Sequence, residues 1–481
     1  GAVAAGMSAA AKLKRMKHEY DVVVYEKTDV VSFGACGLPY FVGGFFDDAN
    51  NMIARSAEKF RETGIDLNVF HEVVKVDTEA KKVTVRNLET NVEFEDSYDK
   101  LMIATGASSI IPPIKNVKLE NVSTLKTMED GIKVKELLNK EENQKVAIIG
   151  AGFIGLEAVE AAKQLGKEVR VFQSESRVLA QVFDKEITDV LEEEIKKHDV
   201  DLRLEELVSE LVGETKVEKI ITNKGEYEAD VVIIATGVRP NTSFLKDTSI
   251  EMLPNGAIIV DEFGRTSVED IYAAGDCATI QNIVTGQDSY VPLATGANKL
   301  GRIVGENLAG ANNSFQGSLG SSCIKVMDME AASTGMTEIQ AQKLGINYKA
   351  KFISDFNQTN YYPGRDKIYV KLVYDADTKV ILGGQVAGFK DSVQRCNVIA
   401  AAIFGKLTTN QLGMLDLCYA PPFGTAKDVV NYAGYVASNL LNGSFKQINV
   451  DKVRELVESG AYIVDVRERA EFENGHIKGA I

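Results

Sequence analysis

A glycine-rich turn near the middle of the chain limits its fold more than any other feature of the sequence. It follows the apolar segment 145–149 and precedes a helical pattern at 156–165 and a second apolar segment at 168–172. The glycines of this turn are Gly150, Gly152 and Gly155. In a strand–turn–helix–strand unit, this spacing permits a tight turn, close approach of the backbone to a pyrophosphate, and close packing of helix on strand. The segment therefore predicts a Rossmann-like unit that binds a dinucleotide.

The beginning of the chain repeats this pattern with one change. A glycine turn at 1–6 leads into a helical pattern at 7–16 and an apolar segment at 20–25, but Val3 stands where the middle glycine is expected. Glu26, followed by Lys27, ends the apolar segment, where a carboxylate can accept hydrogen bonds from a ribose diol. Because a parallel sheet needs a strand before the turn, we expect the sequence to begin a few residues inside the natural protein.

At the point of the second unit that corresponds to this glutamate stands Gln173. A glutamine can bind a ribose diol, but it does not repel a 2′-phosphate as a carboxylate would. Nearby Glu175 and Arg177 have opposite charges, so they act in opposite directions on the binding of a 2′-phosphate. The sequence therefore allows both NADH and NADPH.

Further apolar strands that end in turns place the second unit inside the first. These strands end at Gly106, at Gly237 and in the run 271–276. Two dinucleotide units in one chain imply two dinucleotides held face to face, and hydride transfer follows from that arrangement. The pattern changes to mixed α+β after about residue 316. A new helix-and-strand start appears at 448 and ends in the runs 463–467 and 475–480. The predicted class is α/β, with two Rossmann-like domains, an α+β domain and the start of a further α/β domain.

Composition excludes several classes of protein. The 481 residues suffice for two to four domains, and no apolar run approaches the roughly 20 residues of a membrane span. No secretory segment is recognised. The net charge of −15 disfavours binding to nucleic acid and to anionic membranes. The five cysteines are widely spaced without a CxxC pair, so we expect no disulfide framework, no metal site, and a reducing cytoplasm as the setting.

One cysteine, Cys36, lies in the sequence Ser-Phe-Gly-Ala-Cys-Gly-Leu-Pro, which begins at Ser32. Glycines flank it, and Pro39 suits the first turn of a following helix. A cysteine at a helix N-terminus is favoured as a thiolate. Phe41 stands where a second redox cysteine could form a pair, so one sulfur must cycle alone. It can do so as a mixed disulfide, a persulfide or a sulfenic acid.

Together these motifs resemble the pyridine nucleotide-disulfide oxidoreductase superfamily over residues 1–442. Within it, the chain is similar to the single-cysteine group of coenzyme A-disulfide reductases, persulfide reductases, NADH oxidases and NADH peroxidases. The peroxidases are disfavoured because Ala4 stands where they keep a histidine. The motifs that carry the resemblance are Gly1-Ala-Val-Ala-Ala-Gly6, Ser32-Phe-Gly-Ala-Cys36-Gly-Leu-Pro39, Ala104-Thr-Gly106, Gly150-Ala-Gly-Phe-Ile-Gly155, Ala235-Thr-Gly237, Ala273-Ala-Gly-Asp276 and Tyr419-Ala-Pro-Pro-Phe423.

The resemblance implies FAD in the first unit, NAD(P)H in the second and a homodimer formed through the third domain. Glu26 would bind the adenosine ribose of FAD, and Asp276 would lie near its ribityl chain. Phe153 would cover the flavin, with Glu157 at the same face. The implied domains are FAD-binding 1–112 and 241–315, NAD(P)-binding 113–240, dimerisation 316–442 and partial rhodanese-like 446–481. The expected cofactor-binding residues are Gly1, Gly6, Glu26, Lys27, Ser32, Thr105, Gly106, Gly150, Gly152, Phe153, Gly155, Glu157, Gln173, Gly237, Asp276 and Ala294.

The same resemblance implies a substrate site shared between two subunits. Coenzyme A-disulfide reductases of this type present two tyrosines from the partner subunit near the redox sulfur. Here Tyr419 and either Tyr361 or Tyr362 match those tyrosines. Their hydroxyls could donate a proton to a departing thiolate, and tyrosines that only pack an interface are the alternative. Lys12 and Arg15, on one face of the first helix, match positions that contact the adenine-nucleotide end of coenzyme A.

The C-terminal segment resembles the start of a rhodanese domain through Val464-Asp-Val-Arg467 and Gly475-His-Ile-Lys-Gly-Ala480. Fusion to a sulfur carrier favours disulfides and persulfides over oxygen, although Ala35 stands where many of these reductases have asparagine. The sequence therefore predicts a flavoenzyme that reduces coenzyme A disulfide, or a coenzyme A or related persulfide, with NAD(P)H through Cys36. The alternatives are an NADH oxidase that cycles Cys36 through sulfenic acid, and a flavin-bound redox sensor with negligible turnover.

Overall fold

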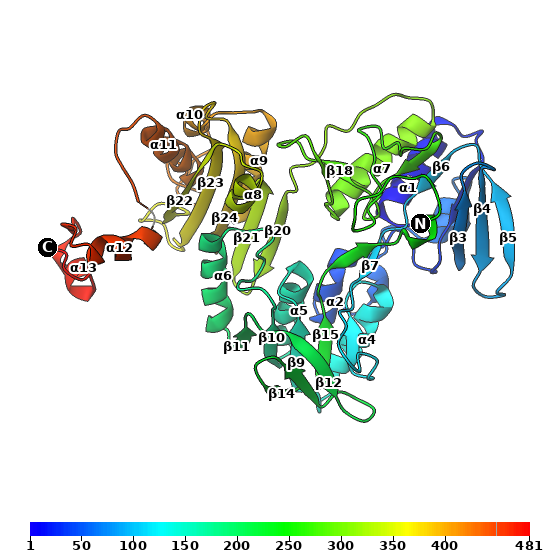
Figure 1. The fold of residues 1–481 in the computed structure, drawn as a ribbon, viewed down its shortest axis with the longest axis horizontal. Coiled ribbons are helices and arrows are strands. Elements are labelled where there is room, and N and C mark those ends of the chain that lie inside the picture. The colour runs from blue at the N-terminus through cyan, green and yellow to red at the C-terminus, as the bar shows by residue number, and fades with distance from the viewer. Residues whose placement is uncertain (449) are drawn as a thin grey trace.

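The structure, a computed structural model, describes residues 1–448 and 450–481 (Figure 1). It contains three folded parts and a short C-terminal segment that extends away from them. The first part combines short parallel strands with an antiparallel sheet, the second is a parallel sheet, and the third is an antiparallel sheet covered by helices. None of the helices in these described residues is both long enough and apolar enough to span a membrane. The architecture has the class that the sequence predicts.

The first part is built from chain segments on both sides of the second nucleotide unit. β1 (Val22–Tyr25) pairs in parallel with β2 (Ile65–Asn68), and β6 (Leu101–Ile103) pairs in parallel with β17 (Ile271–Ala273). Since β6 precedes the second unit and β17 follows it, the second unit is inserted in the first. The other elements here are α2 (Leu38–Val42), α3 (Ala57–Arg61), β3 (His71–Asp77), β4 (Lys82–Asn87), β5 (Glu93–Ser97), β7 (Ala107–Ser109), β16 (Val238–Pro240), β18 (Ile280–Gln281) and β19 (Asp288–Ser289).

Two helices pack face to face in this part with almost no space between them. α1 (Ala4–Met16) follows the first glycine turn, and α7 (Ala294–Leu308) lies against it (Figure 1). A Cβ atom on Gly305 would lie 2.5 Å from the carbonyl oxygen of Ala9, so only glycine allows this approach. α1 begins at Ala4 and not at Met7 as expected, because the last residues of the glycine turn are already helical.

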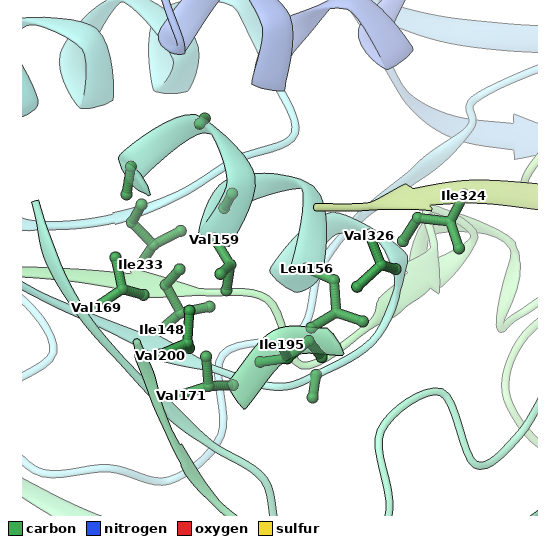
Figure 2. Packing of buried hydrophobic residues seen from close by; sticks show 14 of the residues in the cluster. Ile148, Leu156, Val159, Val169, Val171, Ile195, Val200, Ile233, Ile324 and Val326 are labelled. Atoms are coloured by element: carbon green, nitrogen blue, oxygen red, sulfur yellow. The ribbon is translucent and has the colours of Figure 1, made fainter. Parts of the chain in front are cut away.

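The second part is a five-stranded parallel sheet in the order β11-β10-β9-β15-β8. Figure 2 shows its core, in which Ile148 and Ile233 of the sheet meet Val159 of α5 and Ile195 of α6. The same buried cluster reaches into the third part through Ile324. The elements are β8 (Val122–Thr124), α4 (Met128–Asn139), β9 (Lys145–Ile149), α5 (Phe153–Gln164), β10 (Glu168–Phe172), α6 (Lys185–Lys197), β11 (Val200–Arg203) and β15 (Val231–Ile234), with an antiparallel sheet of β12 (Val208–Val212), β13 (Lys219–Thr222) and β14 (Glu226–Glu228).

The third part is an antiparallel sheet in the order β20-β21-β24-β23-β22. β20 forms the edge that packs against α5 of the second part, and β22 forms the opposite edge. The strands are β20 (Ser322–Val326), β21 (Met329–Gly335), β22 (Tyr348–Phe356), β23 (Lys367–Asp375) and β24 (Ile381–Gly388). The helices are α8 (Glu338–Lys343), α9 (Ser392–Phe404), α10 (Thr409–Gly413) and α11 (Val429–Leu441).

The C-terminal segment forms two short helices, α12 (Val453–Glu458) and α13 (Arg469–Asn474). The strand expected at 463–467 is not formed there, and this expectation was wrong. Val466 is 91% exposed, because this short segment brings no neighbouring sheet against which an apolar strand could pack. Part of the expectation for residues 446–481 falls on residue 449, which lies outside the described residues.

The close contact between α1 and α7 predicts that one methyl group added at Gly305 destabilises the first part. In Gly305→Ala the new Cβ meets backbone atoms of Ala9, which cannot rotate away, so we expect the first part to lose about 1–3 kcal/mol of stability. The measurement is the temperature at which bound flavin is released. Lys299→Ala, on the exposed face of the same helix, is the matched control. Equal release temperatures for the two variants would contradict the close packing.

Candidate active site

The second glycine turn has the geometry of a pyrophosphate cradle. A Cβ on Gly155 would lie 2.0 Å from the oxygen of Gly150, and one on Gly150 would lie 2.4 Å from the oxygen of Ala235. A Cβ on Gly152 would meet nothing within 4 Å, so the middle of the turn is open. α5 begins directly after it, at Phe153, so N–H groups at its N-terminus border the open side. These residues fit a dinucleotide phosphate.

The first glycine turn is closed in the same way. A Cβ on Gly6 would lie 1.9 Å from the oxygen of Gly1, and one on Gly1 would lie 2.1 Å from the oxygen of Ala104. Val3, which replaces the middle glycine, is 37% exposed, so its side chain does not fill the packed side of the turn. The departure from the fingerprint therefore leaves the turn itself intact.

Glu26 and Ser32 are both tied to this first turn. The Glu26 Oε2 atom accepts a hydrogen bond of 2.7 Å from the backbone N–H of Ala2, and the Ser32 N–H donates one of 2.8 Å to the oxygen of Ala2. The Glu26 Oε1 atom accepts from the N–H and hydroxyl of Thr28. Lys27 is exposed beside them. The carboxylate is thus fixed beside the turn, the position from which it could bind an adenosine ribose.

Gln173 is held in place at the second turn, and one nitrogen of the nearby Arg177 guanidinium has partners within the second part. The Oε1 atom of Gln173 accepts a hydrogen bond of 3.2 Å from the N–H of Ala151. The Arg177 guanidinium donates to the oxygen of Phe183 at 3.1 Å and to the hydroxyl of Thr188 at 3.2 Å. Arg177 is thus held against α6 through Nη1, and the opposite effects expected of Glu175 and Arg177 on the choice between NADH and NADPH stay a prediction.

Asp276 lies in the turn that follows β17 and carries an ion pair that the motifs did not indicate. Its Oδ2 atom is 3.2 Å from the Nζ atom of Lys126, which precedes α4. The Tyr290 hydroxyl donates to the backbone oxygen of Asp276 at 3.0 Å. Ala294 opens α7 and is exposed. Lys126 has no sequence signature, so only the fold could place it here.

Thr105 and Gly237 make hydrogen bonds at the ends of β7 and β16, the two paired strands that connect the nucleotide units. The Thr105 hydroxyl donates to the oxygen of Asn241 at 2.7 Å, and the N–H of Ile110 donates to the oxygen of Gly237 at 2.9 Å. Gly106 adopts a φ of +66° and Gly237 one of +111°, a region that glycine enters without strain. Both residues therefore have a structural role in joining the two units.

Cys36 lies in a short 3₁₀ turn and is exposed. α2 follows directly with Pro39 in its first turn, as expected, but α2 has only five residues, so its dipole is weak. Leu38 and Phe41 of α2 are buried in the core cluster of the second part. Because the segment is tied to the first turn at Ser32 and to the second part through α2, Cys36 is placed where the two nucleotide units meet.

Glu157 of α5 lines a small pocket beside α2 together with Tyr40. Burial, with a smaller effect of the Glu160 carboxylate, raises the pKa of Glu157 from 4.5 to about 7. Burial, together with Glu157 and more weakly the Cys36 thiol, also raises the pKa of the Tyr40 phenol. Sequence reasoning missed Tyr40, although it lies one helical turn beyond Cys36.

Tyr361 and Tyr419 are brought together, and Tyr362 is not part of the pair. The hydroxyl oxygens of Tyr361 and Tyr419 are 3.3 Å apart, and this hydrogen bond raises the pKa of Tyr419. The backbone oxygen of Tyr362 instead accepts from the Nε2 atom of Gln358 at 3.2 Å. The structure thus pairs Tyr361 with Tyr419, and which tyrosine faces the redox sulfur stays a prediction.

The tyrosine pair lies far from the Cys36 of the same chain. Residues 357–366 connect β22 to β23, at the edge of the sheet opposite to the β20 edge that contacts α5. Figure 1 shows β22 and α11 on the outer side of the third part, away from α2. One chain therefore does not bring the tyrosines and the sulfur together.

The two basic residues expected at the substrate differ in their availability. The Lys12 Nζ atom is 3.1 Å from the Oε1 atom of Glu306, and the Lys12 side chain is only 19% exposed. Arg15 is exposed on the same helix. Arg15 can therefore contact a phosphate of a bound ligand directly. Lys12 could do so only if it left its ion pair with Glu306.

A family model described as pyridine nucleotide-disulphide oxidoreductase matches residues 1–299. The chain belongs to this family. The model for the family's dimerisation domain matches residues 321–429, and one for a rhodanese-like domain matches residues 449–481. The resemblance drawn from the motifs is confirmed, and FAD and NAD(P)H are the cofactors of the family.

Two curated proteins and one solved structure are similar to this chain over most of its length. The NAD(P)H coenzyme A polysulfide/persulfide reductase of Pyrococcus horikoshii is 41% identical over 89% of this chain and 95% of that protein. The NADH oxidase of Enterococcus faecalis is 35% identical over 91% of this chain and 98% of that protein. The crystal structure of reduced Bacillus anthracis CoADR-RHD has a TM-score of 0.96 at 34% identity, and covers 100% of this chain and 86% of that one.

The raised pKa of Glu157 predicts a pH-dependent stability. The unfolded carboxyl loses its proton near pH 4.5 and the folded one near pH 7, so the folded state binds more protons between these values. Stability should therefore fall as the pH rises through this window, by about 3 kcal/mol in total. Glu157→Gln should remove that fall, measured as Tm of the FAD-loaded enzyme at pH 5 and pH 8. Glu136→Gln, at an exposed site, is the control; a wild-type-like fall in Glu157→Gln would contradict the burial of this carboxyl.

Proposed function

We propose that this chain is an FAD-dependent NAD(P)H oxidoreductase that reduces coenzyme A disulfide, or persulfides of coenzyme A and other small thiols, through Cys36. The observation that carries the proposal is the exposed sulfur of Cys36 on a segment fixed to both nucleotide units. The Pyrococcus horikoshii relative, named for coenzyme A polysulfide and persulfide reduction, supports the same substrate class. We also propose a cytoplasmic location, which the five free cysteines support.

The chemistry of Cys36 follows from thiol–disulfide exchange. Its thiolate attacks one sulfur of the substrate; the S–S bond breaks, one thiolate departs, and Cys36 is left joined to coenzyme A in a mixed disulfide. Bound FAD supplies the electron pair of NAD(P)H to this mixed disulfide. Two electrons and one proton then release coenzyme A as a thiol and restore the Cys36 thiolate. A persulfide follows the same course, with hydrosulfide as the first group to depart.

The tyrosine pair would serve the Cys36 of a partner subunit in a homodimer. Tyr361 and Tyr419 share a hydrogen bond and project from the outer edge of the third part, so either hydroxyl could give a proton to a departing thiolate. Large apolar side chains near this edge are exposed in one chain: Met414 is 68% exposed and Phe423 is 71% exposed. Such a surface is typical of an interface, and the match to the family's dimerisation domain supports it.

The phosphate-bearing end of coenzyme A would lie along α1. Arg15 is the better candidate for a phosphate contact, since its guanidinium is exposed and suits a phosphate group. Lys12 would join it only after leaving Glu306. The carboxylate of Glu306 also faces Arg302 at 3.3 Å, so it would keep one cationic partner if Lys12 moved.

An NADH oxidase is the second candidate, favoured by the Enterococcus faecalis relative. In that reaction Cys36 would cycle through sulfenic acid and the reductant would pass its electrons to oxygen. The two candidates differ in what is bound to the resting sulfur, because only the reductase would carry coenzyme A there.

The deciding experiment compares acceptors and examines the sulfur directly. Purified enzyme with NADH or NADPH is assayed side by side with coenzyme A disulfide, coenzyme A persulfide, oxygen and peroxide. We expect the two sulfur substrates to give the highest kcat/KM and Cys36→Ser to abolish their turnover. Mass spectrometry of freshly isolated, non-reduced protein should show a coenzyme A adduct that Cys36→Ser lacks. Faster turnover with oxygen, and no adduct, would establish the oxidase instead.

The tyrosine assignment predicts a difference between neighbouring residues. Tyr361→Phe and Tyr419→Phe should each lower kcat for coenzyme A disulfide on the order of 10- to 100-fold, because each removes a hydroxyl from the proton-donating pair. Tyr362→Phe is the matched control and should change kcat little. Reduction of the flavin by NAD(P)H, followed in a stopped-flow instrument, should be the same in all three variants. A larger loss in Tyr362→Phe than in Tyr361→Phe would contradict the assignment.

A further inference from the structure

Arg395 of α9 is a buried cation in the third part, away from both nucleotide turns. Its side chain is 7% exposed and faces Asp428, the N-cap residue of α11. The Arg395 Nε atom is 3.1 and 3.0 Å from the two carboxylate oxygens of Asp428, and Nη2 is 2.8 Å from one of them. Asp428 also accepts a hydrogen bond from the N–H of Val430. The pair therefore fixes the guanidinium in one orientation.

The same guanidinium reaches the two loops that carry the tyrosines. The Nη2 atom donates to the backbone oxygen of Asn357 at 2.8 Å and to that of Phe423 at 3.4 Å. Asn357 begins the connection whose outer end is Tyr361, and Phe423 ends the turn that starts at Tyr419. One nitrogen atom thus joins the bases of two loops whose outer ends meet at the tyrosine hydroxyls.

Each loop has its own internal bonds, but these do not fix one loop against the other. In the first, Asn357 and Asp366 exchange two hydrogen bonds of 2.9 Å, and Gln358 donates to Pro363 at 2.7 Å. In the second, the N–H of Phe423 donates to the oxygen of Ala420 at 2.9 Å. Apart from the tyrosine pair itself, Arg395 makes the hydrogen bonds that connect the two loops in the described part of the chain.

We propose that Arg395 is a positioning residue for the reduction of disulfide or persulfide: it sets the separation of Tyr361 and Tyr419 by holding both loop bases. The proposal rests on the function proposed above for these tyrosines. The planar guanidinium matters because it can bind the Asp428 carboxylate with two nitrogens and still donate to both carbonyls. A lysine ammonium could pair with Asp428, but it has no such planar set of donors.

The test separates positioning from folding. Arg395→Lys keeps the ion pair with Asp428, so we expect its Tm to stay near that of the wild type while kcat for coenzyme A disulfide falls about 10- to 100-fold, as for a misplaced catalytic group. The double variant Arg395→Gln/Asp428→Asn, which leaves no unpaired charge, should show the same loss. Ile399→Ala, buried on the same helix one turn further on, is the control that destabilises without touching the loops. Its kcat should remain close to the wild-type value.

A multiple-mutant comparison tests whether Arg395 affects kcat through the two tyrosines. In the Tyr361→Phe/Tyr419→Phe background, Arg395→Lys should cause no further loss of kcat, because the groups that it positions are already absent. Flavin reduction by NAD(P)H should be unchanged in every variant. A loss in Arg395→Lys no greater than in Ile399→Ala, or a further full loss in the tyrosine background, would overturn the proposal.

A measurement that needs no activity keeps this proposal distinct from the proposed function. Photo-oxidation links neighbouring phenols as dityrosine, and peptide mass spectrometry would detect a Tyr361–Tyr419 cross-link. We expect the cross-link in the wild type and in Ile399→Ala, and a yield several-fold lower in Arg395→Lys. An unchanged yield in Arg395→Lys overturns the positioning role even if the enzyme reduces coenzyme A disulfide. Retention of disulfide turnover by Cys36→Ser would instead overturn the proposed function and leave the cross-link result standing.

Discussion

Ile324 and Val326 of β20 are buried in the same apolar cluster as Leu156 of α5 (Figure 2). Lys325, between them, forms an ion pair with Glu160. This contact fixes which edge of the third part faces the nucleotide units. Because the five strands follow in the order β20-β21-β24-β23-β22, the tyrosine loops must then lie at the outer edge. The location of the proposed proton donors is thus a consequence of how one edge strand packs.

A buried ion network strengthens the same junction between the second and third parts. The Lys371 side chain is 2% exposed, and its Nζ atom lies 2.7 Å from a Glu186 carboxylate oxygen and 2.6 Å from one of Glu338. Burial alone would lower the pKa of Lys371, but the surrounding carboxylates outweigh it and raise the pKa. Asp184, 3.6 Å away, also accepts from Gln385 of β24. Removing one partner would leave a buried charge, so the network resists relative movement of the two parts.

The sequence predicts best what local rules decide. The two glycine turns, Glu26 at the end of β1 and Pro39 after the cysteine were all predicted, because turn geometry and strand ends depend on residues close in the chain. The contacts of Arg177 with Phe183 and Thr188 could not be predicted, because these partners come from a later loop and helix. The strand expected at 463–467 failed because a strand needs neighbours that local sequence does not supply.

The same limit explains which parts of the site stayed hidden. The hydrogen bond between Tyr361 and Tyr419 joins two loops that are far apart in the chain, and no spacing in the sequence encodes that contact. Lys126 and Arg395 have no motif, and their roles appear only when distant carboxylates and carbonyl groups surround them. The assignment of each site residue to a cofactor or substrate remains a proposal, supported by this geometry.

The central claim is that a working site takes its sulfur from one subunit and its tyrosines from the other. Hybrid dimers of a Cys36→Ser chain and a Tyr361→Phe/Tyr419→Phe chain, purified with two different affinity tags, test it most directly. In such a hybrid one site has an intact Cys36 facing intact tyrosines, so we predict about half of the wild-type disulfide turnover, far above either parent dimer. Hybrids no more active than the parents would show that sulfur and tyrosines act within one chain, and would contradict this account.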